Sequence, residues 1–310
     1  MKVVITPRGF AKCGLDEVER MRALGVDVDY NDTGKPYSAE TFLAKAKDAD
    51  GIIVGVDDMH DEVLKQLPNL KVVCKFGVGT DNIGLDYCKE HGIFVGRTVG
   101  SNSLSVAEHV AALMFCDAKL LYKTIREVKD GQWNKYTGIE LAGKTLGIVG
   151  FGAIGRCLAS IARGIGMDVL AYDVVGITPE VAAEHRVKVA TLDEIIEGAD
   201  YVSLHVPLLD STRNMISTEE FKRMKPTACV INAARGGVVD EDALYEALTS
   251  GEIRSSAFDV FTTEPPSPSC KLLELDNFLL TSHTASRTSE AEVRTCKIST
   301  DIVLEHLGLE

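Results

Sequence analysis

The sequence predicts an α/β protein built from two doubly wound parallel-sheet domains with a cleft between them. Along the whole chain, short apolar runs of strand character alternate with amphipathic helical stretches, the pattern of a parallel sheet covered by helices. The length of 310 residues exceeds the usual single-domain size of roughly 100–150 residues, so two domains are expected. We place the first domain at residues 1–99 with 286–310, and the second at residues 100–285.

The first domain is predicted from this alternation alone, because it contains no glycine fingerprint. Its expected strands and helices, in chain order, are Lys2–Thr6, Asp16–Leu24, Val26–Tyr30, Ala39–Ala49, Ile52–Val54, Asp61–Leu67, Lys71–Cys74, Leu85–His91 and Ile93–Val95. The tail from about Ser286 is expected to form a helix that closes the chain. Its predicted apolar face consists of Val293, Ile298, Ile302, Val303 and Leu307.

The stretch Ser101–Lys129 is predicted to form one long helix, because it holds no proline and no internal glycine. Apolar residues cover much of its surface. Such a helix is buried between domains or against a second subunit, so it favours a homodimer.

A strand–helix–strand unit at residues 144–173 organises the second domain. The apolar run Leu146–Val149 is followed directly by Gly150, Gly152 and Gly155 in G-x-G-x-x-G spacing, and an amphipathic helix and a second strand come next. Gly150 allows the tight turn, Gly152 lets the backbone approach a pyrophosphate, and Gly155 lets the helix pack on the strand. The order of these parts predicts a Rossmann unit that binds a dinucleotide.

The same unit favours NAD over NADP. The amides of Ala153 and Ile154 open the helix and are expected to face the two phosphates. Asp173 lies 18 residues beyond Gly155, where a carboxylate accepts hydrogen bonds from the adenosine ribose hydroxyls. No cation follows in residues 174–177 to neutralise a 2′-phosphate.

The net charge and the cysteine spacing mainly exclude classes of binding partner. The formal charge of −13 argues against nucleic acid and against an anionic membrane surface, although a few local cations could still bind a small anionic substrate. The eight cysteines show no C-x-x-C pair and no metal-ligand spacing with histidine, so we expect no metal and reduced thiols. We see no signal peptide or membrane span and expect a cytoplasmic protein.

Polar residues end the strands expected in the rest of the second domain. These strands are Val187–Val189, Tyr201–His205, Ala228–Asn232, Ser256–Val260 and Phe278–Thr281, with helices that include Leu192–Glu197 and Glu241–Thr249. His205, Arg235, Asp259 and His283 lie at or just after their carboxyl ends. Ligands bind at this edge of an open α/β sheet, so these residues should converge on the nicotinamide end of the cofactor.

With these motifs the chain resembles the NAD-dependent D-isomer-specific 2-hydroxyacid dehydrogenases, and within them the phosphoglycerate dehydrogenase group. The resemblance covers the whole length through KFGVGTDNI (75–83), NSLSVAEH (102–109), LGIVGFGAIG (146–155), HVPL (205–208), NAARGG (232–237), FDVFTTEP (258–265) and SHTA (282–285). It implies hydride transfer between NAD(H) and a D-2-hydroxy acid such as 3-phosphoglycerate, in a homodimer.

The resemblance also implies the catalytic roles. His283 would be the general acid/base, and Glu264 would orient its imidazole and favour the protonated form. Arg235 would hold the substrate carboxylate with its planar guanidinium. Five other histidines are expected to be structural, namely His60, His91, His109, His185 and His306.

Further contacts are implied for cofactor and substrate. Besides the glycine loop and Asp173, the cofactor-binding set comprises Val106, His205, Val206, Pro207, Thr212, Ala233 and Asp259. The first domain would supply Lys75, Val78 and Gly79 to the substrate carboxylate. Arg8 and Lys75 are hypothesised to serve a second anionic group of the substrate, such as a phosphate. Whether these two residues and Arg287, an unexpected charge near His283, contact substrate is left open.

Two alternatives remain beside the phosphoglycerate interpretation. The related C-terminal-binding co-repressors keep the Arg, Glu and His set, so the chain could instead be an NAD(H)-sensing binding protein that acts through protein partners. Formate dehydrogenases typically carry glutamine where Glu264 stands, which disfavours formate as the substrate. The short stretch after His283 would leave no room for the regulatory domain of longer phosphoglycerate dehydrogenases, so no serine feedback is expected.

Overall fold

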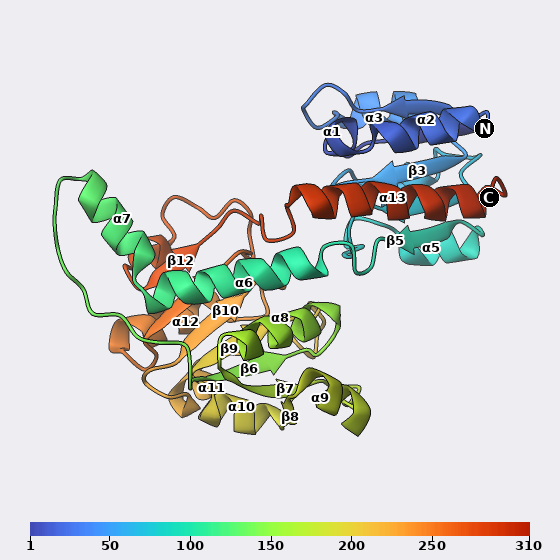
Figure 1. Ribbon diagram of the computed structural model, residues 1–310. Helices are drawn as coiled ribbons and strands as arrows, with labels where there is room; N and C mark the ends of the chain where they lie inside the picture. Colours follow the sequence, from blue (N-terminus) through green and yellow to red (C-terminus); the bar gives the residue numbers. More distant parts are fainter. The chain divides into compact units, whose positions relative to one another are not determined.

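The computed structural model describes residues 1–310, which form two compact units. Unit 1 comprises Met1–Asn102 and Arg287–Glu310, and unit 2 comprises Ser103–Ser286. Each unit is an α/β domain with its own parallel sheet (Figure 1). The prediction of two parallel-sheet α/β domains is therefore confirmed.

Unit 1 contains a five-stranded parallel sheet in the order β2-β1-β3-β4-β5. The strands are β1 (Lys2–Ile5), β2 (Asp27–Tyr30), β3 (Gly51–Val54), β4 (Val72–Lys75) and β5 (Phe94–Arg97). The helices are α1 (Phe10–Cys13), α2 (Leu15–Ala23), α3 (Ala39–Ala46), α4 (Asp61–Leu64), α5 (Leu85–Glu90) and the C-terminal α13 (Ser289–His306).

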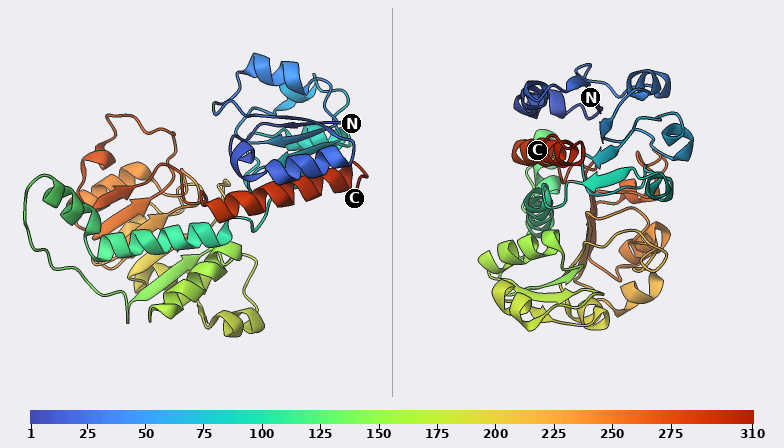
Figure 2. Two further views of the ribbon diagram at one scale, coloured as in Figure 1. Left: turned by 45° about the horizontal axis from the view of Figure 1, so that its top comes forward. Right: turned by 90° about the vertical axis from the view of Figure 1, so that its right-hand side faces the viewer.

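Successive residues of a strand point to opposite faces of this sheet, and both sets are apolar. Helices therefore cover both faces. Val3 and Ile5 of β1 pack in one core with α2 and α13. Val4 packs in the other core, with α3, α4 and α5. Figure 2 shows α2 and α13 running side by side along one face of the sheet.

The apolar face predicted for the C-terminal helix is only partly right. Val303 and Leu307 are buried, but Val293 is 52% exposed. The buried stripe of α13 consists largely of small and polar side chains, including Ala291, Thr295 and Ser299. Their small size suits a helix that lies against a sheet, and hydropathy alone did not mark them as buried.

Unit 2 contains a seven-stranded parallel sheet in the order β12-β11-β10-β9-β6-β7-β8. The strands are β6 (Thr145–Val149), β7 (Asp168–Tyr172), β8 (Lys188–Val189), β9 (Tyr201–Leu204), β10 (Cys229–Asn232), β11 (Ser255–Phe258) and β12 (Phe278–Leu280). The helices are α6 (Ser103–Ala118), α7 (Leu121–Lys129), α8 (Ala153–Gly164), α9 (Pro179–His185), α10 (Leu192–Gly198), α11 (Thr218–Arg223), α12 (Glu241–Ser250) and the 3₁₀ turn η1 (Lys271–Glu274).

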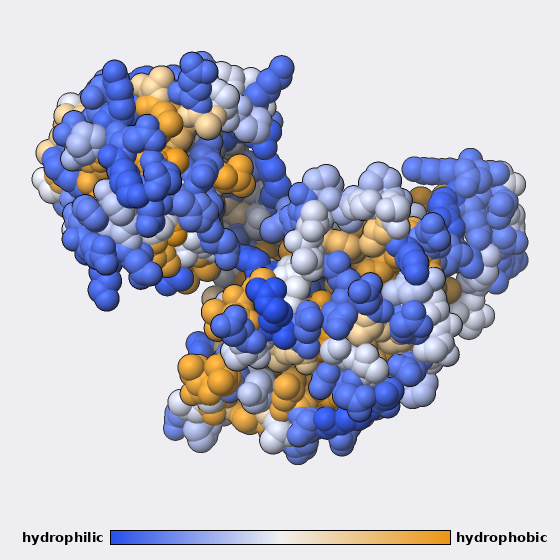
Figure 3. All heavy atoms as spheres, turned by 180° about the vertical axis from the view of Figure 1, so that it is seen from behind, coloured by the Kyte–Doolittle hydropathy of each residue, from blue (hydrophilic) through white to orange (hydrophobic).

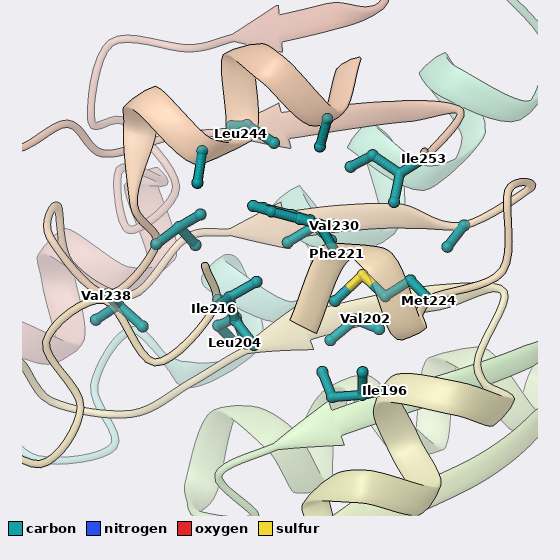
Figure 4. Close-up of a cluster of buried hydrophobic side chains, with 14 of the residues drawn as sticks. Ile196, Val202, Leu204, Ile216, Phe221, Met224, Val230, Val238, Leu244 and Ile253 are labelled. Carbon is teal, nitrogen blue, oxygen red and sulfur yellow. The ribbon is translucent and has the colours of Figure 1, made fainter. Parts of the chain in front are cut away.

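Two apolar layers fix this sheet. On one face α6 and α8 pack on Ile148 and Ile231, and on the other face α10, α11 and α12 pack on Val202 and Val230. Figure 4 shows the second layer, in which Phe221 and Met224 of the α11 segment lie among strand side chains. Because helices cover both faces of the sheet, a ligand can bind only where the strands end.

The single long helix predicted over Ser101–Lys129 is wrong. The chain forms α6 and α7 instead, and Leu120 between them has a left-handed backbone with φ of +53°. The Thr124 hydroxyl bonds to the Leu120 carbonyl in the first turn of α7. A conformational break at a leucine leaves no glycine or proline signal in the sequence, because the backbone there is set by packing.

A buried polar network ties α6 to the amino ends of the strands. The Asp117 carboxylate accepts hydrogen bonds from the Tyr201 hydroxyl at 2.7 Å, the Ser255 hydroxyl at 2.6 Å and the Arg254 guanidinium at 3.0 Å. Asp117 is only 6% exposed, so these donors offset the cost of burying its charge. The network fixes α6, which also carries residues that lie near the opposite, carboxyl edge of the sheet.

Hydrophilic side chains predominate on the face drawn in Figure 3, with apolar side chains in scattered patches. All eight cysteines are free, and burial raises the pKa of the Cys74 thiol to about 12 and of Cys88 to about 11. None of the helices combines the length and the apolar character needed to cross a membrane.

Candidate active site

The carboxyl edge of the unit 2 sheet gathers most of the predicted site residues. Because all seven strands are parallel, the turns that follow β6, β7, β9, β10, β11 and β12 lie at one edge. The residues found there, in strand order, are Gly150, Asp173, His205, Arg235, Asp259 and His283. The sequence predicted the strand-end positions of His205, Arg235, Asp259 and His283, and the glycine motif added Gly150 and Asp173.

The three glycines of the loop after β6 have different surroundings. Gly150 has φ of +96°, and a Cβ there would lie 2.5 Å from the His205 carbonyl oxygen. A Cβ at Gly155 would lie 2.5 Å from the Gly150 carbonyl oxygen. At Gly152 nothing lies within 4 Å of the position that a Cβ would take. Packing therefore requires glycine at 150 and 155, whereas at 152 the open space suits a ligand that approaches the backbone.

The helix start beside this loop suits an anionic group. Gly152 is the N-cap of α8, and no side chain caps the helix there. The first amides of Ala153 and Ile154 therefore point out of the helix end with its positive dipole. The Asp173 carboxylate accepts the Phe151 N–H at 2.8 Å and the Val175 N–H at 3.0 Å. Asp173 thus holds the glycine loop against the end of β7.

His205 closes the other side of the glycine loop. Its backbone N–H donates to the Val149 carbonyl at 2.7 Å, and its Nε2 lies 2.9 Å from the Ser203 hydroxyl. Nδ1 is buried and has no hydrogen-bond partner. Burial lowers the pKa of His205 to about 4, so the imidazole is neutral near pH 7. A buried unpaired nitrogen at this edge is consistent with a polar ligand completing the site.

Thr212 shapes the turn after His205 and Pro207. Its hydroxyl donates to the Pro207 carbonyl at 2.6 Å and accepts the Leu209 N–H at 2.8 Å. Pro207 is exposed, and Val206 is partly buried.

Arg235 is carried by a turn that is braced from two sides. The buried Asn232 side chain donates to the Arg235 carbonyl at 2.9 Å and accepts the Ala234 N–H at 3.1 Å. A Cβ at Gly236 would overlap the Phe261 carbonyl, so only glycine allows this turn to lie against the turn that carries Glu264. The Arg235 guanidinium donates to the Ala234 carbonyl at 2.7 Å. Ala233 is partly buried beside it.

Glu264 and His283 form a direct pair. The Nδ1 of His283 lies 2.7 Å from Glu264 Oε2, and Glu264 Oε1 accepts the Phe261 N–H at 3.0 Å. A carboxylate only accepts, so Nδ1 carries the proton of this contact and Nε2 is the ring nitrogen that remains for chemistry. The His283 side chain is 49% exposed, which leaves the ring open to a reactant.

Asp259 is buried beneath the His283 turn. Its carboxylate accepts the Thr284 N–H at 2.9 Å, the Ala285 N–H at 2.8 Å and the Thr281 hydroxyl at 2.6 Å. In α6, Val106 is 5% exposed and His109 reaches the same cluster through Thr281. Asp259 thus holds the backbone of the turn that carries His283.

Unit 1 carries the remaining predicted residues. Lys75 at the end of β4 donates from Nζ to the Gly55 carbonyl and to Asn82 Oδ1, both at 2.6 Å. Val78 and Gly79 follow in the next turn, and Val78 is 38% exposed. Arg8 is exposed after β1. Arg287 lies 3.4 Å from Glu292 in an ion pair.

Comparison with known proteins decides the family. Residues 111–285 match the model of the D-isomer specific 2-hydroxyacid dehydrogenase, NAD binding domain. Over 298 residues the chain is 36% identical to a glyoxylate reductase of Korarchaeum cryptofilum, covering 94% of this chain and 88% of that protein.

The chain belongs to the D-isomer-specific 2-hydroxyacid dehydrogenase family.

Other members differ in name and length. A D-3-phosphoglycerate dehydrogenase of Archaeoglobus fulgidus is 38% identical over 95% of this chain and 56% of that protein. The chain spans about half the length of the curated phosphoglycerate dehydrogenases it matches. The crystal structure of D-lactate dehydrogenase from Aquifex aeolicus, complexed with NAD and lactic acid, aligns with a TM-score of 0.82 at 31% identity and covers 99% of this chain and 96% of that one.

Family membership, the parallel-sheet fold and NAD as cofactor are thereby confirmed for this dehydrogenase family member. Its own residues fit NAD in unit 2: the open space at Gly152, the uncapped helix start and the carboxylate of Asp173 lie together after β6 and β7. The sequence patterns assigned no role to Thr281 and only a structural one to His109. His109 stands in the NSLSVAEH motif, which is the one signal that could have singled it out.

The glycine loop leads to a first prediction. Gly152→Ala should leave the fold and thermal midpoint unchanged, because the added Cβ meets open space. It should weaken NADH binding by roughly tenfold or more, because the methyl group would occupy the pyrophosphate's approach. Gly164→Ala at the far end of α8 also meets open space and should bind NADH normally. Fluorescence titration measures both, and equal affinities of the two variants would refute the assignment of Gly152.

A second prediction concerns acid stability. The folded state keeps His205 neutral down to about pH 4, whereas in the unfolded chain it binds a proton below about pH 6.5. Unfolding therefore takes up a proton between these values, and stability falls as the pH falls through this window. Between pH 7 and pH 5 this residue should account for about 2 kcal/mol of lost unfolding free energy. Urea titrations should show a smaller loss in His205→Asn, and an equal loss would contradict the explanation.

Proposed function

We propose that the protein is an oxidoreductase that transfers a hydride between NAD(H) and a D-2-hydroxy acid or its 2-keto acid. The observation that carries the proposal is the pair of His283 and Glu264, 2.7 Å apart, in the same unit as the glycine loop. A histidine oriented by a carboxylate, with one ring nitrogen left open, is the arrangement of a general acid/base. The names of related proteins, such as hydroxypyruvate reductase and glyoxylate reductase, describe the oxidation or reduction of small acids of this kind.

The proton is assigned to His283 Nε2. Nδ1 faces Glu264, so the ring presents Nε2 to the carbonyl oxygen of a keto acid or the hydroxyl of a hydroxy acid. When bound, NAD(H) supplies or takes up the hydride. His283 gives its proton to the oxygen in the reducing direction and takes it back in the oxidising direction, which contributes roughly 10²–10⁴ to the rate.

Arg235 is assigned to the substrate carboxylate. Its planar guanidinium can bind a carboxylate through two parallel hydrogen bonds, which a lysine could not match. The turn that presents it is braced by Asn232 and lies against Phe261, close to the turn of Glu264. This bracing supports a fixed arginine rather than a mobile surface charge.

The substrate is proposed to be 3-phosphoglycerate or a similar small hydroxy acid. The relatives named phosphoglycerate dehydrogenase, hydroxypyruvate reductase and glyoxylate reductase support this class. Lys75, Val78 and Gly79 of unit 1 are proposed to bind the acid, and Arg8 with Lys75 a second anionic group. Lys75 already donates to two oxygen atoms, which holds its Nζ in place.

A keto-acid panel tests this function. NADH oxidation with phosphohydroxypyruvate, hydroxypyruvate, pyruvate and glyoxylate should show fast turnover of at least one member. His283→Ala should lower kcat by roughly 10²–10⁴ with NADH still bound. If Arg8 and Lys75 bind a phosphate, Arg8→Ala and Lys75→Ala should lower the activity with phosphohydroxypyruvate more than the activity with hydroxypyruvate. An unchanged preference between these two acids would refute the assignment of Arg8 and Lys75 to a second anionic group. No turnover with any acid would favour an NAD(H)-sensing role.

We further propose a homodimer that covers α7. This helix has no buried residue, although Leu121, Tyr122, Ile125 and Val128 recur on it and are between 42% and 54% exposed. Trp133 in the following arm is 79% exposed. Contiguous apolar surface of this kind is rare on a monomer, and an amphipathic helix gains stability by burying such a face against a second copy.

Light scattering tests the dimer with a matched pair of variants. The wild type should show twice the chain mass of 33.5 kDa. Val128→Asp on α7 should shift the mass towards the monomer, because burying an unpaired carboxylate is costly. Val293→Asp on α13 changes an equally exposed valine, 52% against 50%, and should stay dimeric. A monomeric wild type, or the same mass for both variants, would rule out this interface.

A further inference from the structure

A hydrogen-bond chain runs beneath the turn that carries His283. It begins at His109 of α6, passes through Thr281 after β12 and ends at Asp259 after β11. His109 Nε2 lies 2.9 Å from Thr281 Oγ1, and that oxygen lies 2.6 Å from Asp259 Oδ1. The imidazole also comes within 3.6 Å of the same carboxylate oxygen. Three segments far apart in the sequence thus meet at one buried carboxylate.

The direction of this chain follows from what each group can donate. Asp259 is the acceptor in this cluster: its Oδ1 accepts the Thr284 N–H, and its Oδ2 accepts the Ala285 N–H. The Thr281 hydroxyl must then donate its hydrogen to Asp259. Its oxygen is left to accept, so His109 Nε2 carries a hydrogen and donates it to Thr281. The chain is polarised from α6 towards the carboxylate.

The carboxylate in turn fixes the backbone of the histidine turn. Besides the amides of Thr284 and Ala285, the N–H of His283 donates to the Asp259 carbonyl at 2.8 Å. His283 has φ of +52°, a left-handed conformation that is unfavourable for a residue with a side chain. Such a conformation persists only where the surroundings hold it. Here Asp259 supplies the hold on both sides of His283.

Glu264 cannot supply this hold by itself. It contacts the imidazole only at Nδ1, and its side chain is 38% exposed. The ring position therefore depends on the backbone beneath it as well as on the Glu264 contact. Asp259 is 1% exposed, and the Thr281 hydroxyl is the one side-chain donor that holds its carboxylate beside the two backbone amides.

We propose that His109 and Thr281 are positioning residues that hold Asp259, and through it the backbone of His283, in the geometry needed for proton transfer. This inference rests on the proposed function, in which His283 is the acid/base. His109 and Thr281 act through His283 rather than on the substrate. Because a displacement of about 1 Å can cost roughly 10²-fold in rate, a loss of this chain should appear in kcat.

The pair Thr281→Val and Thr281→Ser tests the proposal. Valine keeps the shape without the hydroxyl, whereas serine keeps the hydroxyl. At saturating NADH we expect Thr281→Val to lower kcat between roughly 10-fold and 100-fold, with KM for the keto acid within about twofold of the wild type. Thr281→Ser should recover most of kcat. Equal kcat values for valine and serine variants would overturn the proposal.

A double-mutant cycle separates this inference from the proposed function. In a His283→Ala background, Thr281→Val should lower the residual rate no further, because the chain acts through His283. The same fold loss in both backgrounds would show that Thr281 acts elsewhere and would overturn the inference. Full turnover of His283→Ala alone would instead overturn the proposed function.

A second pair keeps the test decisive if Thr281→Val fails to fold. His109→Gln can place an amide N–H near the position of Nε2, whereas His109→Leu cannot donate. At saturating NADH the glutamine variant should retain more of kcat than the leucine variant. Equal losses in the two variants would overturn the proposal. His185→Leu serves as the control, because that histidine only lies edge-on to Phe151.

Discussion

The parallel order of the unit 2 strands is the constraint on which the candidate site depends. In the order β12-β11-β10-β9-β6-β7-β8 every strand ends at the same edge, and the chain direction across the sheet reverses between β6 and β9. Ligands bind at such a switch point because the loops on either side diverge there. The glycine loop follows β6 and His205 follows β9, so they flank this point. The neighbours β10, β11 and β12 bring the turns of Arg235, Asp259 and His283 together.

Much of this arrangement could be predicted from the sequence. Alternating apolar runs indicate a parallel sheet, and in a parallel sheet the residues after each strand must share an edge. The glycine spacing adds a chemical signal, because the needs of Gly150 and Gly155 are steric and local. The family motifs then named Arg235, Glu264 and His283, although their roles remain proposals. The predictions of the parallel sheets and of the glycine loop succeed because their causes lie within a few residues of sequence.

Other features depend on contacts that sequence patterns do not encode. His109 and Thr281 are 172 residues apart, and only the packing of α6 against the sheet brings them together. The bond of Asp117 to Ser255 spans 138 residues in the same way. The sequence did not predict the break at Leu120 or the exposure of Val293. Both have the same origin, because packing decides the backbone angle at Leu120 and the buried face of α13. The hydropathy of a residue shows whether its side chain can be buried, but the tertiary contacts determine whether it is.

We propose that the carboxyl edge of the unit 2 sheet brings a nicotinamide cofactor together with a proton donor for a D-2-hydroxy acid. The most direct measurement uses NADH that carries deuterium at both C4 positions of the nicotinamide, follows the label into the product formed from a 2-keto acid, and determines the configuration of that product. We expect deuterium at C2 of the D-hydroxy acid. Product of the L configuration, or product without deuterium at C2, would contradict the claim.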